Sequence, residues 1–359
     1  MIERIQWSFS ARGRTFDGND ITISLPIVRG TLTLDESWSP YVQVDLEGAL
    51  EVISSGNVTF NDFWPVDFYL DPTIRTHYVD IVASQTGTAP GETMSRPFTT
   101  QIGERVIDPA AKVFTLKTNS SETVLLRDFH IGTGPITPGP FDRMWQLVNY
   151  VLGRSGAHLT NISGPAQLVG TNSELRPWAP GVSAWDYIMN QVREANLKLW
   201  CDEYGAWWLR DARPVEDLGV LLSDDTNMVG GDHIATLEGT YYTGVQLEYR
   251  WTDDAGNQRV AYGVAEQTAP GSPARFYTKT INSPYPGNNQ AIVVLREKMK
   301  ERYTYVLRSI IDLRVTPGQR IQVGRGYGGA PVNGFFYAYV QAVTFDFETD
   351  EMTVRVRAY

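Results

Sequence analysis

The sequence is poor in the residues that build metal sites and disulfides. Its single cysteine, Cys201, cannot form a disulfide within the chain, which removes the signature of a disulfide-stabilised extracellular scaffold. The four histidines stand apart from one another and from the cysteine, so a zinc site is not expected. No apolar run is long enough to cross a bilayer, and the first residues do not form a signal peptide. We expect a protein folded in the cytoplasm that needs neither metal nor cofactor.

The charge balance argues against a nucleic-acid-binding surface. The formal net charge is −10, whereas gripping phosphates requires clustered Lys and Arg. Hydrophobic residues make up 42% of the chain and charged residues 20%, which is typical of globular proteins. The 10 Trp and 18 Tyr suit β-rich cores and protein interfaces alike. At 359 residues, two or three packed units are expected.

Motifs for catalysis are scarce as well. The sequence has no Gly-x-Ser-x-Gly nucleophile elbow. The segment 324–329 is rich in glycine but lacks the Lys-Ser/Thr ending and the following helix of a phosphate loop. It lies between two predicted strands and therefore predicts a flexible hairpin loop. Arg325 and Tyr327 at its tip are candidates for contact with a neighbouring subunit.

Two pairs of adjacent acids could in principle serve a glycosidase, which needs two carboxylates flanking a sugar bond. They are Asp202 with Glu203, and Asp224 with Asp225. Sequence neighbours on a turn rarely converge on one substrate, so we interpret all four as solvated turn acids. The chain is therefore not expected to be an enzyme.

Short alternating runs separated by turn residues fill the first 135 residues and predict the strands of a barrel or sandwich. The stretch 85–97 is rich in Gly, Thr, Ser and Pro and predicts a long exposed loop. The predicted strands are Ile21–Leu25, Val42–Leu46, Val66–Leu70, Tyr78–Val82, Lys112–Lys117 and Thr123–His130.

A boundary is expected at residues 132–140, because three prolines and three glycines cannot continue a helix or a central strand. A helix with one apolar side is predicted next. Its apolar residues are Phe141, Met144, Trp145, Val148, Val151 and Leu152.

The segment 183–210 predicts a helix followed by a hairpin. Ser183 can cap the helix, with Asp186 near its positive dipole end. Two strands, 197–200 and 206–209, flank a turn that ends at Gly205. Trp207 and Trp208 alternate, so one should lie in the core while the other could bind a sugar or a partner, or lie beneath another domain. Trp207 is kept as a third candidate for a subunit interface. The helix has an apolar face made by Trp185, Ile188, Met189, Val192 and Ala195.

The β-pattern returns after residue 213 and is interrupted by one helix near 288–303, which Asn288 or Asn289 can cap. The sequence thus predicts a β-rich α+β fold with two β-barrel-like domains and a small α/β module between them. The expected boundaries are 1–138, 139–212 and 213–359. The strands predicted in the last part are Val245–Tyr249, Arg259–Val264, Ile310–Val315, Ile321–Val323, Phe335–Phe347 and Met352–Val356.

This order of parts resembles the tail-hub proteins of long-tailed bacteriophages, which are called minor tail proteins in phages of actinobacteria. Their layout is similar to the baseplate hub of contractile-tailed phages. The resemblance covers the chain from about residue 140 to the end and rests on the order of its motifs. These are SAWDYI…ANLKLWCDEYGAWWL, GVQLEYRWTDDAGN, REKMKERY, LRVTPGQRIQV and MTVRVRAY.

The resemblance implies a structural role at the tail tip of a virion assembled in the bacterial cytoplasm. Members of this family form a trimeric ring in which two barrel-like domains per subunit give pseudo-sixfold symmetry. Implied partners are other copies of the chain, the distal tail or tail tube protein, the tape measure protein and fibre or spike proteins. DNA would pass through without specific binding, which suits an acidic chain. The family offers no catalytic residues to carry over.

Two other functions remain open from the residues alone. The first is a β-rich module that binds host cell-wall glycan through an exposed tryptophan. The second is a glycan hydrolase with a carboxylate pair on the β-scaffold.

Overall fold

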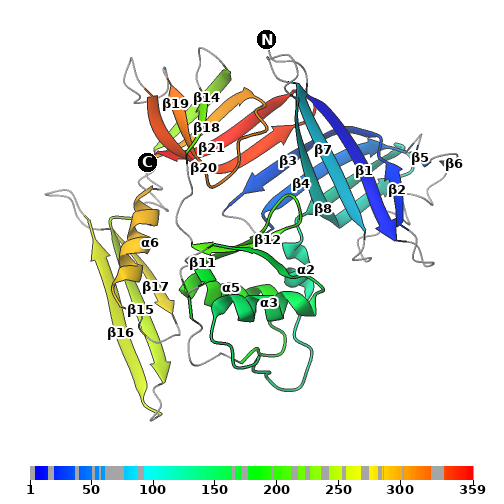
Figure 1. Cartoon of the computed structure of the whole chain (residues 1–359). Coiled ribbons are helices and arrows are strands. Elements are labelled where there is room, and N and C mark those ends of the chain that lie inside the picture. Colours follow the sequence, from blue (N-terminus) through cyan, green and yellow to red (C-terminus); the bar gives the residue numbers. More distant parts are fainter. Residues whose placement is uncertain are drawn as a thin grey trace. The chain divides into compact units, whose positions relative to one another are not determined.

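A computed structural model shows a β-rich α+β fold, which confirms the predicted fold class (Figure 1). The chain divides into two compact units. The first comprises residues 1–216, 310–319 and 341–353, and the second comprises 217–309, 320–340 and 354–359. The division into three consecutive domains stays a prediction. The structure describes residues 5–14, 20–36, 40–50, 53–55, 58–60, 77–86, 93–163, 166–167, 169–170, 177–195, 197–211, 217–222, 227–235, 242–252, 256–267, 275–281, 285, 287–300, 303–324 and 335–358.

A large antiparallel sheet forms most of the first unit outside the module. Its strand order is β20–β3–β4–β9–β8–β7–β1–β2, and each neighbouring pair is antiparallel. A short hairpin of β5 (Ile53–Ser55) and β6 (Val58–Phe60) belongs to the same part of the chain. The strands of the large sheet are β1 (Gln6–Arg14), β2 (Asp20–Ser24), β3 (Ile27–Asp35), β4 (Val42–Ala49), β7 (Tyr78–Thr86), β8 (Thr93–Asp108), β9 (Val113–Asn119) and β20 (Phe335–Asp346).

Alternation of apolar and polar residues gives this sheet one buried face. In β4, Val42, Val44 and Leu46 are buried, while the residues between them are partly or fully exposed. Gly48 continues the buried set and lies opposite Phe114 of β9. A Cβ atom at Gly48 would come within 2.3 Å of the Phe114 ring, so the ring fills the space that a side chain there would need.

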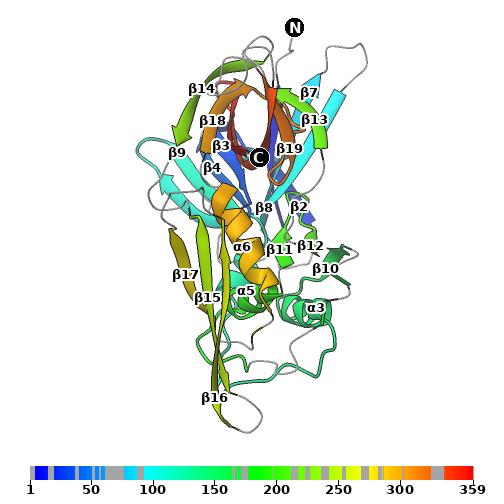
Figure 2. The ribbon, with the colours of Figure 1, turned by 90° about the vertical axis from the view of Figure 1, so that its left-hand side faces the viewer.

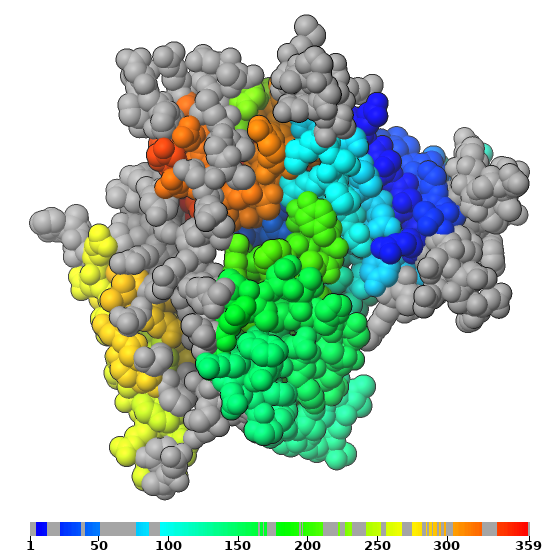
Figure 3. All heavy atoms as spheres, viewed as in Figure 1, coloured from blue at the N-terminus to red at the C-terminus, as the bar shows by residue number. Residues whose placement is uncertain are grey.

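The helix–hairpin module, residues 120–211, is also part of the first unit. Its small sheet has the order β10–β12–β11, in which β10 runs parallel to β12 and β11 runs antiparallel to it. Its helices pack on one face of this sheet, and the space-filling view shows their tightly packed outer surface in green (Figure 3). The elements are α2 (Glu122–Arg127), α3 (Met144–Arg154), β10 (Leu159–Ile162), α5 (Ala184–Glu194), β11 (Leu197–Cys201) and β12 (Trp207–Asp211).

Local signals set the ends of both long helices in the module. The hydroxyl oxygen of Ser183 accepts a hydrogen bond from the Asp186 amide at 3.0 Å, so the predicted cap of α5 is confirmed. At the end of α3, Gly156 takes a φ of +78°. The Gly156 amide donates to Gly153 and the Ala157 amide donates to Leu152, which is the Schellman arrangement.

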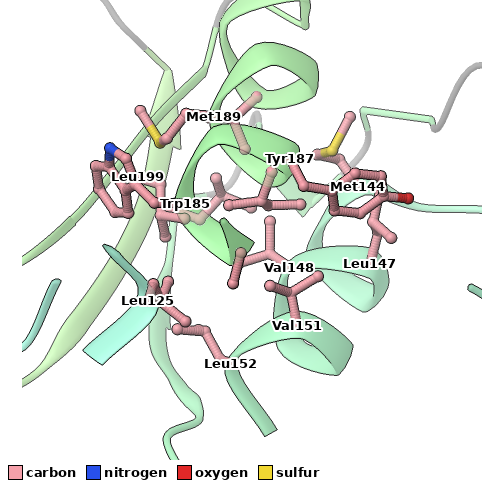
Figure 4. Close-up of a cluster of buried hydrophobic side chains, with 14 of the residues drawn as sticks. Leu125, Met144, Leu147, Val148, Val151, Leu152, Trp185, Tyr187, Met189 and Leu199 are labelled. Atoms are coloured by element: carbon pink, nitrogen blue, oxygen red, sulfur yellow. The ribbon is translucent and has the colours of Figure 1, made fainter. Parts of the chain in front are cut away.

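The apolar faces of these helices meet in one core (Figure 4). As predicted, Ile188 and Val192 of α5 lie in this core, and Val148 and Val151 of α3 pack against them. The remaining buried members are Leu125, Met144, Leu147, Leu152, Ala166, Trp178, Ala184, Trp185, Tyr187, Met189, Leu197, Leu199, Cys201, Trp207 and Leu209.

The second unit contains two groups of strands. In one group, β14 pairs with β18, and β13 lies parallel to β19, which pairs with β20. In the other, β15 is central, antiparallel to β16 and parallel to β17. The elements are β13 (Asp217–Leu222), β14 (Met228–Ala235), β15 (Gly244–Thr252), β16 (Gln258–Glu266), β17 (Phe276–Ile281), α6 (Asn289–Lys300), β18 (Tyr303–Ile310), β19 (Arg320–Gly324) and β21 (Glu351–Ala358).

Helix α6 covers one face of the β15–β16–β17 sheet (Figure 2). Ala291 and Leu295 of α6 pack on Val245, Leu247 and Tyr249 of β15. Asn288, which with Asn289 was an expected cap, stands directly before this helix, and its backbone carbonyl accepts from the Ala291 amide at 3.1 Å. The Asn288 side-chain amide oxygen accepts from the backbone N–H of Val264 at 2.8 Å, and its amide nitrogen donates to the Val264 carbonyl at 2.9 Å. Asn288 thus occupies the outer backbone groups of edge strand β16, as a further strand would.

Three local predictions are wrong, in each case because tertiary packing decides the outcome. Residues 93–97 are the start of β8, paired with β7, although 85–97 was expected to be a loop. Thr123–His130 was expected to be a strand, but α2 forms there and places Leu125 in the module core. Ile310–Val315 was expected to be a strand, yet β18 ends at Ile310. The predicted strand Val66–Leu70 lies outside the described residues.

Candidate functional site

The turn between β11 and β12 is held by the buried carboxylate of Asp202. Its Oδ1 accepts from the backbone amides of Tyr204 at 2.9 Å and Ala206 at 2.8 Å. Its Oδ2 accepts from the indole N–H of Trp208 at 2.6 Å. Burial raises the pKa of Asp202, and the hydrogen bond from Trp208 opposes that rise. Asp202 is 9% exposed, so its interpretation as a solvated turn acid is wrong.

The next residue, Glu203, forms a buried ion pair with Arg96 of β8. The Nη2 and Nε atoms of Arg96 donate to Glu203 Oε1 at 2.5 and 3.1 Å. The side chains of Arg96 and Glu203 are 3% and 7% exposed, so solvation does not weaken the pair. The backbone amide of Thr99 donates to the Glu203 carbonyl at 2.7 Å, which fixes the turn to β8. Glu203 is therefore not a solvated acid either.

Arg96 also binds the segment that follows β18. Its Nη1 donates to the carbonyl oxygens of Leu313 at 2.7 Å and Val315 at 3.0 Å, and its Nη2 donates to the Thr316 hydroxyl at 2.9 Å. Together with the two bonds to Glu203, these contacts use all five N–H groups of the guanidinium. One side chain thus joins β8, the β11–β12 turn and residues 313–316.

A second buried carboxyl, that of Glu122, lies in the same junction. The Ser120 hydroxyl donates to its Oε2, and the backbone amide of Cys201 donates to its Oε1 at 2.8 Å. The Ser120 oxygen in turn accepts from the backbone amide of Val42 at 3.0 Å. Desolvation raises the pKa of Glu122 to about 7, although these hydrogen bonds oppose the rise. Glu122 thus connects β4, α2 and β11.

Arg96 and Glu122 were not among the residues expected to matter. A signal for Arg96 does exist, because it alternates with the buried Phe98 and Thr100 in β8 and so occupies an inward-facing position. An arginine at such a position requires a buried partner. Glu122 stands at the start of an apolar run, Thr-Val-Leu-Leu, which places it near a core.

The hydrogen bonds of Asp202 and Glu203 indicate that these two acids hold the structure together at this junction. Glu203 is bound to Arg96, and Asp202 is bound to its own turn and to Trp208. These two carboxylates therefore have separate partners and do not flank an open space where a sugar could lie. The alternative pair, Asp224 and Asp225, lies outside the described residues.

The three interface candidates have different positions. Trp207 is 3% exposed and belongs to the module core, so its ring offers almost no surface to a second chain. Trp208 points to the opposite face, where it stacks on Trp200 with ring centroids 5.9 Å apart. Arg325 and Tyr327 lie outside the described residues.

Within the part of the chain that the structure describes, no three His, Cys, Asp or Glu side chains converge as a metal site requires. Cys201 is fully buried, and burial raises the pKa of its thiol well above the usual value. His130 is buried and lies 2.9 Å from the Gly134 carbonyl through its Nε2. Cys201 and His130 are therefore both buried parts of the folded structure.

A hollow of about 450 Å³ lies on the large sheet of the first unit, beside strands β3, β4, β8 and β9. Two ion pairs join residues of its lining, Arg29 with Glu47 at 2.7 Å and Lys117 with Glu104 at 3.0 Å. Its lining has acidic character, because five carboxylates face two basic groups. The lining contains no aromatic ring on which a sugar could stack, so the hollow does not favour glycan binding. The lining residues are Arg29, Gly30, Thr31, Asp45, Leu46, Glu47, Glu104, Thr115, Leu116, Lys117, Asp346 and Glu348.

The face of the β15–β16–β17 sheet away from α6 carries exposed apolar side chains. Val260, Tyr262 and Val264 recur at every second position of β16, and each is about half exposed. Contiguous apolar surface of this kind is typical of protein–protein contacts. None of the described helices has the length and apolar character needed to span a membrane.

Comparison with known proteins finds matches to the structure of this chain but none to its sequence. No protein-family model matches the sequence, and no curated protein matches it. The fold nevertheless matches solved structures along nearly the whole chain. The tail protein from Neisseria meningitidis MC58 is 12% identical with a TM-score of 0.60, and the match covers 98% of this chain and 96% of that one. The 43 kDa tail protein of prophage MuSo2 from Shewanella oneidensis is 11% identical with a TM-score of 0.60, covering 98% of both chains.

A third match comes from a type VI secretion system. The c3393 protein of E. coli is described as a component of that system with structural similarity to the T4 bacteriophage tail proteins gp27 and gp5. It is 10% identical with a TM-score of 0.51, and the match covers 99% of this chain and 77% of that one. At such low identity these likenesses establish a shared fold. The chain thus has a fold similar to that of phage tail proteins.

Proposed function

We propose that this protein is a structural component of a phage-type tail, forming a trimeric hub ring at the tail tip. The observation that supports this is the extent of the match. Two phage-type tail proteins align with 98% of this chain and with 96% and 98% of their own lengths. A shared domain within an otherwise different protein would align over part of each chain. The buried junction of Arg96, Glu203 and Glu122 suits a rigid subunit that performs no chemistry.

In this proposal the ring joins the tail tube or distal tail protein above to fibres or a spike below. The tape measure protein would cross its centre before infection, and DNA would cross it afterwards. A net charge of −10 favours passage of DNA without binding, because like charges repel. Of the three interface candidates, Arg325 and Tyr327 remain our proposed contact residues, while Trp207 is committed to the core.

Size-exclusion chromatography with light scattering tests the assembly. The chain has a mass of 40.2 kDa, so a trimer has a mass of about 121 kDa, three times that value. We expect this species, and expect the double variant Arg325→Ala, Tyr327→Ala to move the distribution toward the monomer. Labelling of virions with an antibody to this protein should place it at the tail tip. A monomer at every concentration, absent from virions and bound to cell-wall glycan, would support the carbohydrate-binding alternative instead.

A further inference from the structure

The β15–β16–β17 sheet of the second unit has two edges, and the chain itself covers part of one of them. Just beyond β16, the Gln267 amide donates to the Thr243 carbonyl at 2.8 Å, so the odd-numbered residues of β16 face β15 and Val264 faces outward. The side-chain amide of Asn288 binds both outward backbone groups of Val264, at 2.8 and 2.9 Å. These are the two hydrogen bonds that a residue of an added antiparallel strand would make.

The opposite edge, formed by β17, is open. Just before β17, the Arg275 carbonyl accepts from the Gly244 amide at 3.0 Å, so Arg275 faces β15. Backbone groups alternate in direction along a strand, and those of Phe276, Thr278 and Thr280 therefore point away from β15. No residue in the described part of the chain binds these outward groups, and all three side chains are exposed. Such an edge is a template for an added strand.

Basic side chains flank this edge. Lys279 is exposed, and its register with the buried Leu247 places it on the face of the sheet that carries α6. On the same face, Lys298 of α6 lies 5.3 Å from the centre of the Tyr277 ring. Strand β17 contains no acidic residue, although the whole chain has a net charge of −10. An added strand therefore gains from an acidic residue beside Lys279, because opposite charges on neighbouring strands attract.

This charge pattern disfavours a second copy of β17 as the added strand. Two β17 strands paired antiparallel about Thr278 would bond their outward residues to one another. Their two Lys279 side chains would then lie on one face as diagonal neighbours, where like charges repel. The edge therefore suits an acidic segment of a different protein.

We propose that the outer edge of β17 is a strand-addition site for an extended segment of a partner protein, with an acidic residue of that segment beside Lys279. The added strand continues the sheet in the order β16–β15–β17–partner. The side chain of Asn288 obstructs the other edge, so addition takes place at β17. The inference rests on the second unit alone and does not depend on the proposed function.

The probe is a synthetic peptide of sequence Thr-Val-Thr-Glu-Thr-Val-Thr, blocked at both ends. Its alternation places the threonines on one face and the glutamate on the face of Lys279. Hydrogen exchange of the full-length protein, followed by mass spectrometry with and without excess peptide, measures binding. We expect the peptide to slow exchange in β17, whose outward amides become bonded, and to leave residues 258–264 of β16 unchanged. The same peptide with lysine in place of glutamate should bind about two- to tenfold more weakly.

Three variants locate the site. Thr278→Pro removes an outward N–H and should abolish the protection. Val260→Pro is the matched control, because it removes an outward N–H on the other edge of the same sheet, and should leave binding unchanged. Lys279→Glu changes only an exposed side chain and should reverse the preference, so that the lysine peptide binds more tightly.

The wild-type protein alone can overturn the proposal. Absence of protection by either peptide would do so, and so would equal protection by both. Slow exchange of the outward β17 amides before any peptide is added, accompanied by self-association that Thr278→Pro abolishes, would assign the edge to a second copy instead. A protein that stays monomeric but still binds the glutamate peptide at β17 would contradict the trimeric hub and leave this site intact.

Discussion

Arg96 shows how a single side chain can satisfy backbone groups that would otherwise need a neighbouring strand. Ile311, Leu313 and Val315 are buried at alternating positions, which is the pattern of a strand. The carbonyls of Leu313 and Val315 are bound by the Arg96 guanidinium. The alternating pattern of residues 311–315 therefore indicates correctly which side chains are buried, but the segment is not a strand.

Arg96→Lys should destabilise the first unit by about 1–3 kcal/mol, because the ammonium keeps the charge opposite Glu203 but leaves buried acceptors of the guanidinium unsatisfied. A lysine ammonium has three donors and cannot reach Leu313, Val315 and Glu203 together. Urea unfolding followed by tryptophan fluorescence measures the loss.

The control is Arg29→Lys, whose exposed pair with Glu47 should leave the unfolding midpoint unchanged. Equal midpoints for Arg96→Lys and the wild type would show that the buried pair is not needed for stability.

Residues with short-range partners were predicted better than residues with remote partners. The Ser183 cap could be predicted, since its partner is three residues away. The burial of Glu203 could not, because its partner Arg96 is 107 residues away and nothing near Glu203 indicates it. The burial of Asp202 is an intermediate case. Its hydrogen-bond partners are at most six residues away in the sequence, but they reach its carboxylate only when the turn is folded.

Among the elements, α5 and the following hairpin were predicted almost to the residue. A capping serine, an apolar stripe at helical spacing and a turn glycine with φ of +79° are all local. Helix α2 was missed because six residues are too few to show a helical period. It is stabilised by packing, with Leu125 in the module core.

The cap of α5 gives a prediction for that helix. Ser183→Ala should cost about 1 kcal/mol, because the Asp186 amide loses its acceptor in a buried position. Urea unfolding of the first unit should show a shift of this size.

Ser121→Ala is the companion variant, since Ser121 occupies the same position in α2 and makes no side-chain cap bond. Its side chain contacts the Cys201 thiol, a weak acceptor, so a smaller shift is expected. Shifts of equal size would contradict the capping role of Ser183.

At the scale of the whole molecule, each of the two units is built from segments that are not consecutive in the sequence. Residues 310–319 and 341–353 belong to the first unit, although they follow most of the second unit in the chain. Ala342–Asp346 of β20 pairs with β3, and residues 313–316 bind Arg96. Periodicity identified these segments as structured but contains no information on the part of the chain they join.

This arrangement predicts the behaviour of fragments. Residues 1–216 alone should lack a cooperative unfolding transition, because β3 loses its β20 partner and Arg96 loses two carbonyl acceptors. Residues 1–353 contain every segment of the first unit and should retain the transition. Circular dichroism during urea titration distinguishes the two. A cooperative transition in the shorter fragment, at the midpoint of the full chain, would refute the prediction.

Because residues 310–319 and 341–353 belong to the first unit, this unit can be completed only late in translation. Residue 353 must leave the ribosome before that unit is complete. At about 5–20 residues per second, translating the intervening sequence takes on the order of 10 s. Throughout that interval the nascent β3 lacks its partner β20, so its unpaired backbone groups can pair with other nascent chains on the same messenger RNA. We therefore expect the yield of folded protein to rise when chaperones protect the nascent chain late in translation.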